Sequence, residues 1–210
     1  MRNVITWRPA FTSILLTEDM LVPVNFELEL RMQIVSEVFE EQDIALERIQ
    51  TVVESFFGGS LICTMNEFAA ELPYAFSNNV VAVPCEPTDH ILCGLLYTKC
   101  NAVAEGKIVM EEICIVSSRG SGIEYSISHE HPLPIFLQNT NSAVSPWFLR
   151  NDISFTDSFQ LENKNIIEFP LEYSSWEEME LNWDRNSKPV TEGKDTDIID
   201  FKSIMPKNEG

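Results

Sequence analysis

Residues 22 to 34 carry an apolar side chain at every second position, and this alternation constrains the fold more than any other feature. The apolar members are Val22, Val24, Phe26, Leu28, Leu30, Met32 and Ile34. A period of two is that of a β-strand, whose successive side chains point to opposite faces. The polar residues between them would also suit a helix, but a helix would scatter the apolar side chains around its circumference. The pattern therefore predicts one long strand with one buried face.

Two helices are predicted from apolar residues that recur three and four positions apart. The first covers about residues 42 to 57 and stops at a glycine pair. The second begins at Thr88 or Asp89, the candidate N-cap, and extends to about Glu105 before Gly106. The positions that recur along this second helix are Ile91, Leu92, Leu95, Leu96, Lys99 and Val103.

A β-bulge is predicted in the strand that follows the second helix. Two apolar pairs of opposite parity lie along it, namely Ile108, Met110, Ile113 and Ile115. One extra residue at Glu111-Glu112 would keep both pairs on the core face. The turn at residues 118 to 122 then returns the chain, so that residues 123 to 128 are expected to pair back as a hairpin.

The predicted fold class is α+β, with two helices on one face of an antiparallel sheet. Short strands are expected at residues 60–64 and 80–83, which gives the order strand, helix, strand, strand, helix, strand. This order is that of a split β-α-β, ferredoxin-like arrangement, here with an extra hairpin and an irregular C-terminal segment. Three parts are predicted: a core domain at 1–135, an extension packed on it at 136–184, and a mobile acidic tail at 185–210.

The chain is strongly acidic, with 33 Asp and Glu against 14 Lys and Arg and a formal net charge of -19. Such a protein repels nucleic acid and anionic membrane surfaces at long range, so neither is an expected partner. Hydrophobic residues make up 44% of the chain, which is ordinary for a packed core. The charge is therefore expected on the outside. It either keeps the protein dispersed or docks on a protein partner with a basic surface.

No membrane span or secretory signal is expected. No apolar run approaches the roughly 20 residues that cross a bilayer. The apolar stretch at residues 11 to 16 lacks a small-residue cleavage site after it. Five cysteines without a CxxC pair favour reduced thiols in the cytoplasm; they lie at Cys63, Cys85, Cys93, Cys100 and Cys114.

Metal and catalytic sites were sought among the three histidines. His90 could join Cys93 and Cys100 on the second helix as zinc ligands if a loop cysteine completed the set, although buried helix cysteines are the simpler interpretation. His129 and His131 would point to one side of a strand and form half of a metal site. No third ligand is identifiable, and a solvated strand end is the alternative. No catalytic residue and no cofactor are assigned.

Aromatic residues in the second half are candidate partner contacts, because Trp often anchors interfaces. Packing on the protein's own core is the alternative for this segment. A capping box at Ser175 predicts a short helix that extends to Trp183, and the tail contains an apolar island flanked by acids. The candidate partner-binding residues are Trp147, Phe148, Trp176, Trp183, Ile198, Ile199 and Phe201.

Three stretches resemble small uncharacterised proteins of large tailed bacteriophages. They are QDIALERI at 42–49, PCEPTDHI at 84–91 and KCNAVAEG at 99–106, and the resemblance covers about residues 20 to 130. It implies a role in the phage programme inside an infected bacterium and transfers no catalytic residue.

The leading hypothesis is a non-enzymatic acidic phage accessory protein that acts by protein–protein interaction with a host or phage complex. Two alternatives stay open. One is a virion or assembly component, a homo-oligomer whose long strand at 22–34 pairs with neighbouring copies. The other is a metal-dependent hydrolase with a metal at His129 and His131.

Overall fold

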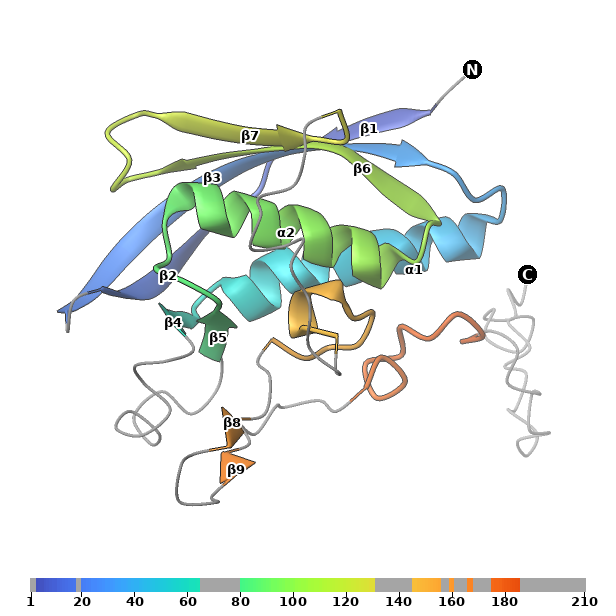
Figure 1. The fold of residues 1–210 in the computed structure, drawn as a ribbon. Coiled ribbons are helices and arrows are strands. Elements are labelled where there is room, and N and C mark those ends of the chain that lie inside the picture. The colour runs from blue at the N-terminus through green and yellow to red at the C-terminus, as the bar shows by residue number, and fades with distance from the viewer. Residues whose placement is uncertain are drawn as a thin grey trace, which may run out of the picture.

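The fold is mixed α+β, with seven strands in one mostly antiparallel sheet and two long helices packed against the same face of it (Figure 1). The structure is a computed structural model that describes residues 3–17, 20–64, 80–130, 145–155, 159–160, 166–167 and 175–185. In the described part of the chain, neither long helix is both long enough and apolar enough to cross a bilayer.

The sheet has the strand order β5-β4-β2-β3-β6-β7, and β1 pairs with the second half of β3. Its strands are β1 (Val4–Trp7), β2 (Ala10–Thr17), β3 (Met20–Ile34), β4 (Leu61–Thr64), β5 (Val80–Val83), β6 (Ile108–Ser117) and β7 (Glu124–Ser128). The helices are α1 (Phe39–Gln50), which continues as the π-helix η1 (Thr51–Phe57), α2 (Asp89–Ala104), and the 3-10 turn η2 (Trp147–Leu149). A separate two-stranded sheet joins β8 (Phe159–Gln160) and β9 (Ile166–Ile167).

The long alternating strand is confirmed as β3. Its even-numbered residues from Val24 to Met32 are buried, and most of those between them are exposed. Over residues 26 to 33 the strand lies inside the sheet, with β1 and β2 along one edge and β6 along the other. The assembly hypothesis requires a free strand edge that can pair with a second copy. This stretch has none.

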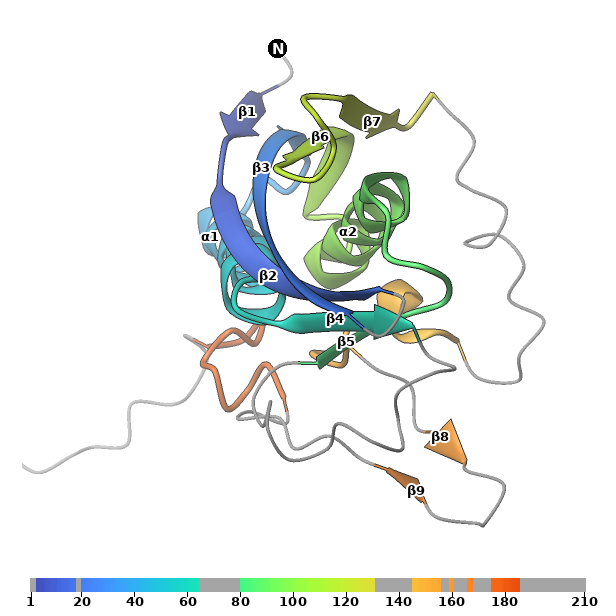
Figure 2. The same cartoon turned by 90° about the vertical axis from the view of Figure 1, so that its left-hand side faces the viewer.

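The ferredoxin-like strand order is not confirmed. A split β-α-β arrangement would place the strand at 80–83 beside β3. Instead β2 occupies that position as a hairpin with β3, and β5 lies at the edge of the sheet, parallel to β4 (Figure 2). The difference comes from residues 10 to 17, which the sequence patterns do not predict as a strand.

The first helix keeps a wide buried face by changing its winding. Its buried residues recur as neighbouring pairs every four positions and are Ile44, Ala45, Arg48, Ile49, Val52, Val53, Phe56 and Phe57. A repeat of four drifts around an α-helix of 3.6 residues per turn, and the wider turns of η1 act against this drift. The element ends at Gly58, where a Cβ atom would lie 2.2 Å from the carbonyl oxygen of Glu54.

The second helix and the bulge both agree with the sequence-based prediction. Thr88 is the N-cap of α2, and Glu105 and Gly106 end it with φ angles of 47° and 75°. The pairing of β3 with β6 shifts register between Arg31 and Met32, which leaves Glu111 as the extra residue. Both apolar pairs of β6 are consequently buried. Strand β7 pairs antiparallel with β6.

Two C-terminal stretches lie against the helices, residues 145–155 and 175–185 (Figures 1 and 2). Both contribute to the main hydrophobic core, through Trp147, Phe148, Ile153, Phe155, Trp176 and Leu181. The predicted helix at 175–183 is a series of turns instead. The Glu178 N–H does donate to Ser175 Oγ at 3.4 Å, but Glu180 adopts a φ of 58°, which no α-helix continues through. The predicted tail beyond Arg185 lies outside the described residues.

Candidate functional site

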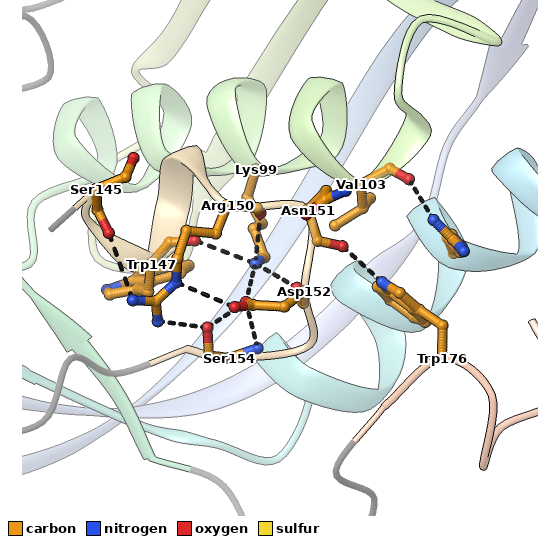
Figure 3. Close-up of polar contacts among 10 residues, drawn as sticks. Lys99, Val103, Ser145, Trp147, Arg150, Asn151, Asp152, Ser154 and Trp176 are labelled. Atoms are coloured by element: carbon orange, nitrogen blue, oxygen red, sulfur yellow. Dashed lines mark hydrogen bonds and ion pairs between the residues drawn. The ribbon is translucent and has the colours of Figure 1, made fainter. Parts of the chain in front are cut away.

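Lys99 lies in the middle of α2 with its side chain fully buried. Its ammonium group donates three hydrogen bonds to backbone carbonyl oxygens, those of Trp147 (3.1 Å), Arg150 (3.0 Å) and Asp152 (2.7 Å) (Figure 3). The aromatic rings of Trp147 and Phe155 lie 5.7 and 5.0 Å from Nζ. An ammonium group has three hydrogens to donate, so the three carbonyls use all of them. The lysine thereby fastens residues 145–155 to α2.

Charged and polar groups surround this lysine on its solvent side. The Asp152 carboxylate lies 3.7 Å from Nζ and 3.1 Å from Arg150 Nε, and it accepts hydrogen bonds from the Ser154 N–H and hydroxyl. Burial lowers the pKa of Lys99 to about 7, although the Asp152 charge acts in the opposite direction. Burial acts to raise the pKa of Asp152, but the Ser154 hydrogen bonds and the Lys99 and Arg150 charges outweigh it and lower that pKa.

A lysine with a lowered pKa can serve as a base or nucleophile where substrate reaches it. Here the Nζ atom is enclosed and its three hydrogens are directed at the protein's own carbonyls. The arrangement therefore holds a chain segment in place.

Arg48 plays the same part for residues 175–185. Its side chain is 3% exposed, and the guanidinium lies over the ring of Trp183 at 4.0 Å and that of Trp176 at 4.9 Å. Nε donates to the Leu181 carbonyl at 2.8 Å, and Nη1 forms an ion pair with Glu105 at 2.9 Å. Burial lowers the pKa of Arg48, and the hydrogen bond and charge of Glu105 act against that change. A stacked, hydrogen-bonded guanidinium of this kind is a stable anchor.

The sequence analysis assigned no role to either buried cation, although a signal is present. Lys99 occupies a position in the apolar repeat of α2, and Arg48 lies four residues after the buried Ile44 of α1. A lysine or arginine at a core-facing helix position must find partners for its charge when it is buried. Such a position predicts a buried anchor, even though the partners stay unknown.

A small cavity of about 190 Å³ opens at the N-terminus of α2, beside the turn between β6 and β7. It is lined by Pro87, Thr88, Asp89, Arg119, Gly120, Ile123 and Tyr125. The Ser117 hydroxyl donates to the buried Asp89 carboxylate at 2.6 Å. The cavity is smaller than the roughly 300–1,000 Å³ of typical ligand pockets. Its lining includes both a carboxylate and a guanidinium, so it favours no single ligand charge.

The predicted metal ligands are not brought together. His129 is exposed at the end of β7, and His131 lies outside the described residues. On α2, His90 is exposed whereas Cys93 and Cys100 are buried. In the part of the chain that the structure describes, no three His, Cys, Asp or Glu residues are grouped as a metal site requires. Burial raises the pKa of Cys93 and of Cys100 to about 12, whereas a reactive thiol needs a lowered pKa.

Most of the aromatic partner-binding candidates lie inside the protein. Trp147, Phe148 and Trp176 are buried in the main core, so as they stand they offer no ring to a partner. Trp183 is half-buried against Arg48. The remaining candidates, Ile198, Ile199 and Phe201, lie outside the described residues.

Exposed apolar side chains instead gather where β3 turns into α1. Val35, Val38 and Phe39 are 49%, 52% and 75% exposed; we call these three residues the corner patch. Exposed acidic residues lie within and beside it, namely Glu37, Glu40 and Asp43. The sequence gives no signal for this patch, because Val35 directly follows the alternating strand and is not distinguished from its apolar residues.

Comparisons with known proteins identify no family. No protein-family model matches the chain, and no curated protein matches it. Among solved structures, two catalytic-residue mutants of Plasmodium vivax 6-pyruvoyltetrahydropterin synthase are similar, at 11% and 10% identity with TM-scores of 0.36 and 0.34. Each match covers 60% of this chain and 97% of the other chain. A likeness of this extent carries no inference about the function of this protein.

Proposed function

We propose that this protein is a non-enzymatic acidic binding protein of phage type, which acts in the bacterial cytoplasm by contact with a basic surface of a host or phage complex. The observation that supports this proposal best is the concentration of carboxylates on the outer face of the sheet, the face opposite the two described long helices.

The outer face brings glutamates from three neighbouring strands together. Glu29 of β3 lies directly opposite Cys114 of β6. Cys114 has two further acidic neighbours, Glu112 two positions earlier on β6 and Glu124 on the adjacent strand β7. Burial is the largest cause that raises the pKa of Cys114, and the charges of Glu112, Glu124 and Glu29 raise it further, to about 11. Three carboxylates thus lie around one thiol of the outer face.

Exposed arginines offset only part of this negative charge. The two most deeply buried cations, Lys99 and Arg48, are used as internal anchors. On the outer face, Arg8 pairs with Glu29 and Arg31 with Glu112, and all four side chains are substantially exposed. Exposed ion pairs contribute little to stability, so the lysines and arginines of a partner can replace them.

An acidic face of this kind increases chiefly the rate at which a basic partner associates. The test is affinity capture from infected bacterial cells with the tagged full-length chain, followed by elution at rising salt and mass spectrometry. We expect specific proteins with basic surfaces, released as salt screens the charges. Capture of no specific protein, or of partners that stay bound at about 1 M salt, would contradict the proposal.

The two alternatives make different measurable predictions. An assembly component should form a symmetric oligomer, which native mass spectrometry of the purified protein detects. A metal-dependent hydrolase should retain a transition metal, which elemental analysis detects. The assembly alternative needs a free edge on β3, which is paired on both edges over residues 26–33. The hydrolase alternative needs further metal ligands beside His129, and no such group lies among the described residues.

A further inference from the structure

The corner patch is held rigidly, although it lies in a connection between a strand and a helix. The Val38 N–H donates to Ser36 Oγ at 3.1 Å, the Ser36 hydroxyl donates to Glu41 at 2.5 Å, and the Gln42 amide donates to the Ser36 carbonyl at 2.8 Å. Lys107 holds the same Glu41 carboxylate through an ion pair of 2.7 Å. Several contacts therefore order the backbone under the patch, and its apolar side chains are exposed to solvent.

No contact among the described residues explains why these residues are apolar. Val38 occupies the N-cap of α1, where it provides no side-chain hydrogen bond; Ser, Thr, Asp or Asn would stabilise the helix there by about 0.5–2 kcal/mol. Phe39 has the highest exposed fraction of the large hydrophobic residues described. A single exposed apolar residue is ordinary, but a group of them held in place marks an interaction surface.

The apolar surface continues from the corner patch onto the outer face of the sheet. Val4 of β1 and Val109 of β6 both lie directly opposite Gln33 of β3, so all three side chains share one face. The two valines are 42% and 37% exposed. Val35 lies two positions after Gln33, just beyond the end of β3. The corner patch therefore adjoins this row of exposed side chains.

The acidic residues around the patch determine what can bind it. Glu37, Glu40 and Asp43 are exposed, and within the described residues none of them forms an ion pair. Glu40 and Asp43 lie three positions apart on one side of α1, a like-charge spacing that destabilises a helix slightly. Phe39 and Asp43, four positions apart, are neighbours on the same surface.

We propose that the corner patch docks a basic amphipathic segment of a partner protein. Apolar side chains of that segment would cover Phe39, Val38 and Val35, while its Lys or Arg residues meet the three carboxylates. This inference rests on the proposed function and gives it a location. A second copy of the chain would bring like-charged carboxylates together, and like-charge contacts across an interface are costly. A basic segment removes that repulsion and buries the apolar surface at once.

The first test uses a defined probe, a fluorescein-labelled synthetic peptide with Leu at helical spacing and Lys elsewhere. A second peptide carries Ser in place of each Leu and has the same charge. Anisotropy titrations at moderate salt should show clearly tighter binding of the Leu peptide. Phe39→Ser should weaken that binding by about fivefold or more, as for an interface hot spot. Met20→Ser changes another exposed large apolar residue (59%), at the opposite end of β3; it is the control and should bind like wild type.

The second test separates location from overall charge. The pair Glu40→Lys with Asp43→Lys changes the net charge by the same amount as Glu54→Lys with Glu86→Lys, at exposed positions outside both the corner patch and the sheet. The first pair should weaken the Leu peptide about tenfold more than the second. Circular dichroism melts of all variants confirm that each one folds.

The outcomes distinguish the two levels of the proposal. Salt-dependent binding of both peptides with equal affinity, or no effect of Phe39→Ser, overturns the docking site and leaves the acidic binding function intact. No binding of either peptide even at low salt overturns both. A concentration-dependent dimer of the free protein that Phe39→Ser abolishes also overturns the docking site, because the patch would then serve self-association.

Discussion

Replacing Lys99 by methionine should remove a rise in stability that the wild-type protein shows between about pH 7 and pH 9. Burial lowers the pKa of Lys99 from 10.5 to about 7 in the folded protein. Within that window the unfolded chain still binds a proton that the folded protein has released. Stability increases with pH wherever the unfolded state binds more protons. The cost of burying the ammonium is therefore full below pH 7 and declines as the pH approaches 10.5.

The magnitude follows from the two pKa values. Each pH unit inside the window changes the free energy of unfolding by up to about 1.4 kcal/mol. From pH 7, where half of the folded molecules are protonated at Lys99, to pH 9, the change adds up to about 2 kcal/mol. Lys99→Met retains most of the aliphatic chain and removes the titrating group. It also leaves the carbonyl of Trp147, among others, without its donor, which alters the stability of the variant by an amount largely independent of pH.

The assay is urea unfolding of both proteins at the two pH values, with the same slope m as a control for unchanged compactness. The difference between wild type and Lys99→Met should shift by about 2 kcal/mol in favour of wild type at the higher pH. Buried thiols titrate in both proteins and cancel in this difference. Lys107→Met, which removes a partly exposed lysine, should follow wild type. Identical pH dependence in wild type and Lys99→Met would refute the account of Lys99.

Three further substitutions test the packing. Arg48→Met should destabilise the protein by about 2 kcal/mol, because it leaves the carbonyl of the buried Leu181 without its donor, and should speed amide exchange in residues 175–185; exchange unchanged there would show that the arginine does not anchor that stretch. Gly58→Ala should destabilise by about 2 kcal/mol or more, since the new Cβ would lie 2.2 Å from a backbone oxygen. Gly59→Ala meets no neighbouring atom but has a φ of 72°, so it should cost only about 1 kcal/mol; equal costs in urea unfolding would contradict the steric argument.

Periodicity identified β3 and α2, although only β3 has a single buried face, since α2 is buried continuously from residue 92 to 100. The strand β3 and the helix α2 repeat their apolar residues with the spacing of their secondary structure, and the parity change around Glu111 revealed the bulge. Strand β2 was missed because both of its faces are covered: Leu15 belongs to the main core and Leu16 to a second cluster with Leu61. A strand buried on both faces shows a continuous apolar run rather than alternation.

Strand order and buried anchors depend on contacts between distant parts of the chain. No local pattern predicts the parallel pairing of β4 with β5. Lys99 finds its carbonyl partners 48 to 53 residues later, and Arg48 reaches the Leu181 carbonyl 133 residues later. The spacing marks both cations as core-facing, but only the folded chain brings their acceptors to them. The same holds for Trp147 and its burial in the core.

The most direct test of the central claim is the salt dependence of the rate at which this protein associates with a basic partner or the basic Leu peptide. Stopped-flow measurements at about 0.05 M and about 0.5 M salt span a wide range of screening lengths. The account predicts that the association rate constant falls at least about tenfold at the higher salt while dissociation changes much less. An association rate that stays the same across this range would contradict it.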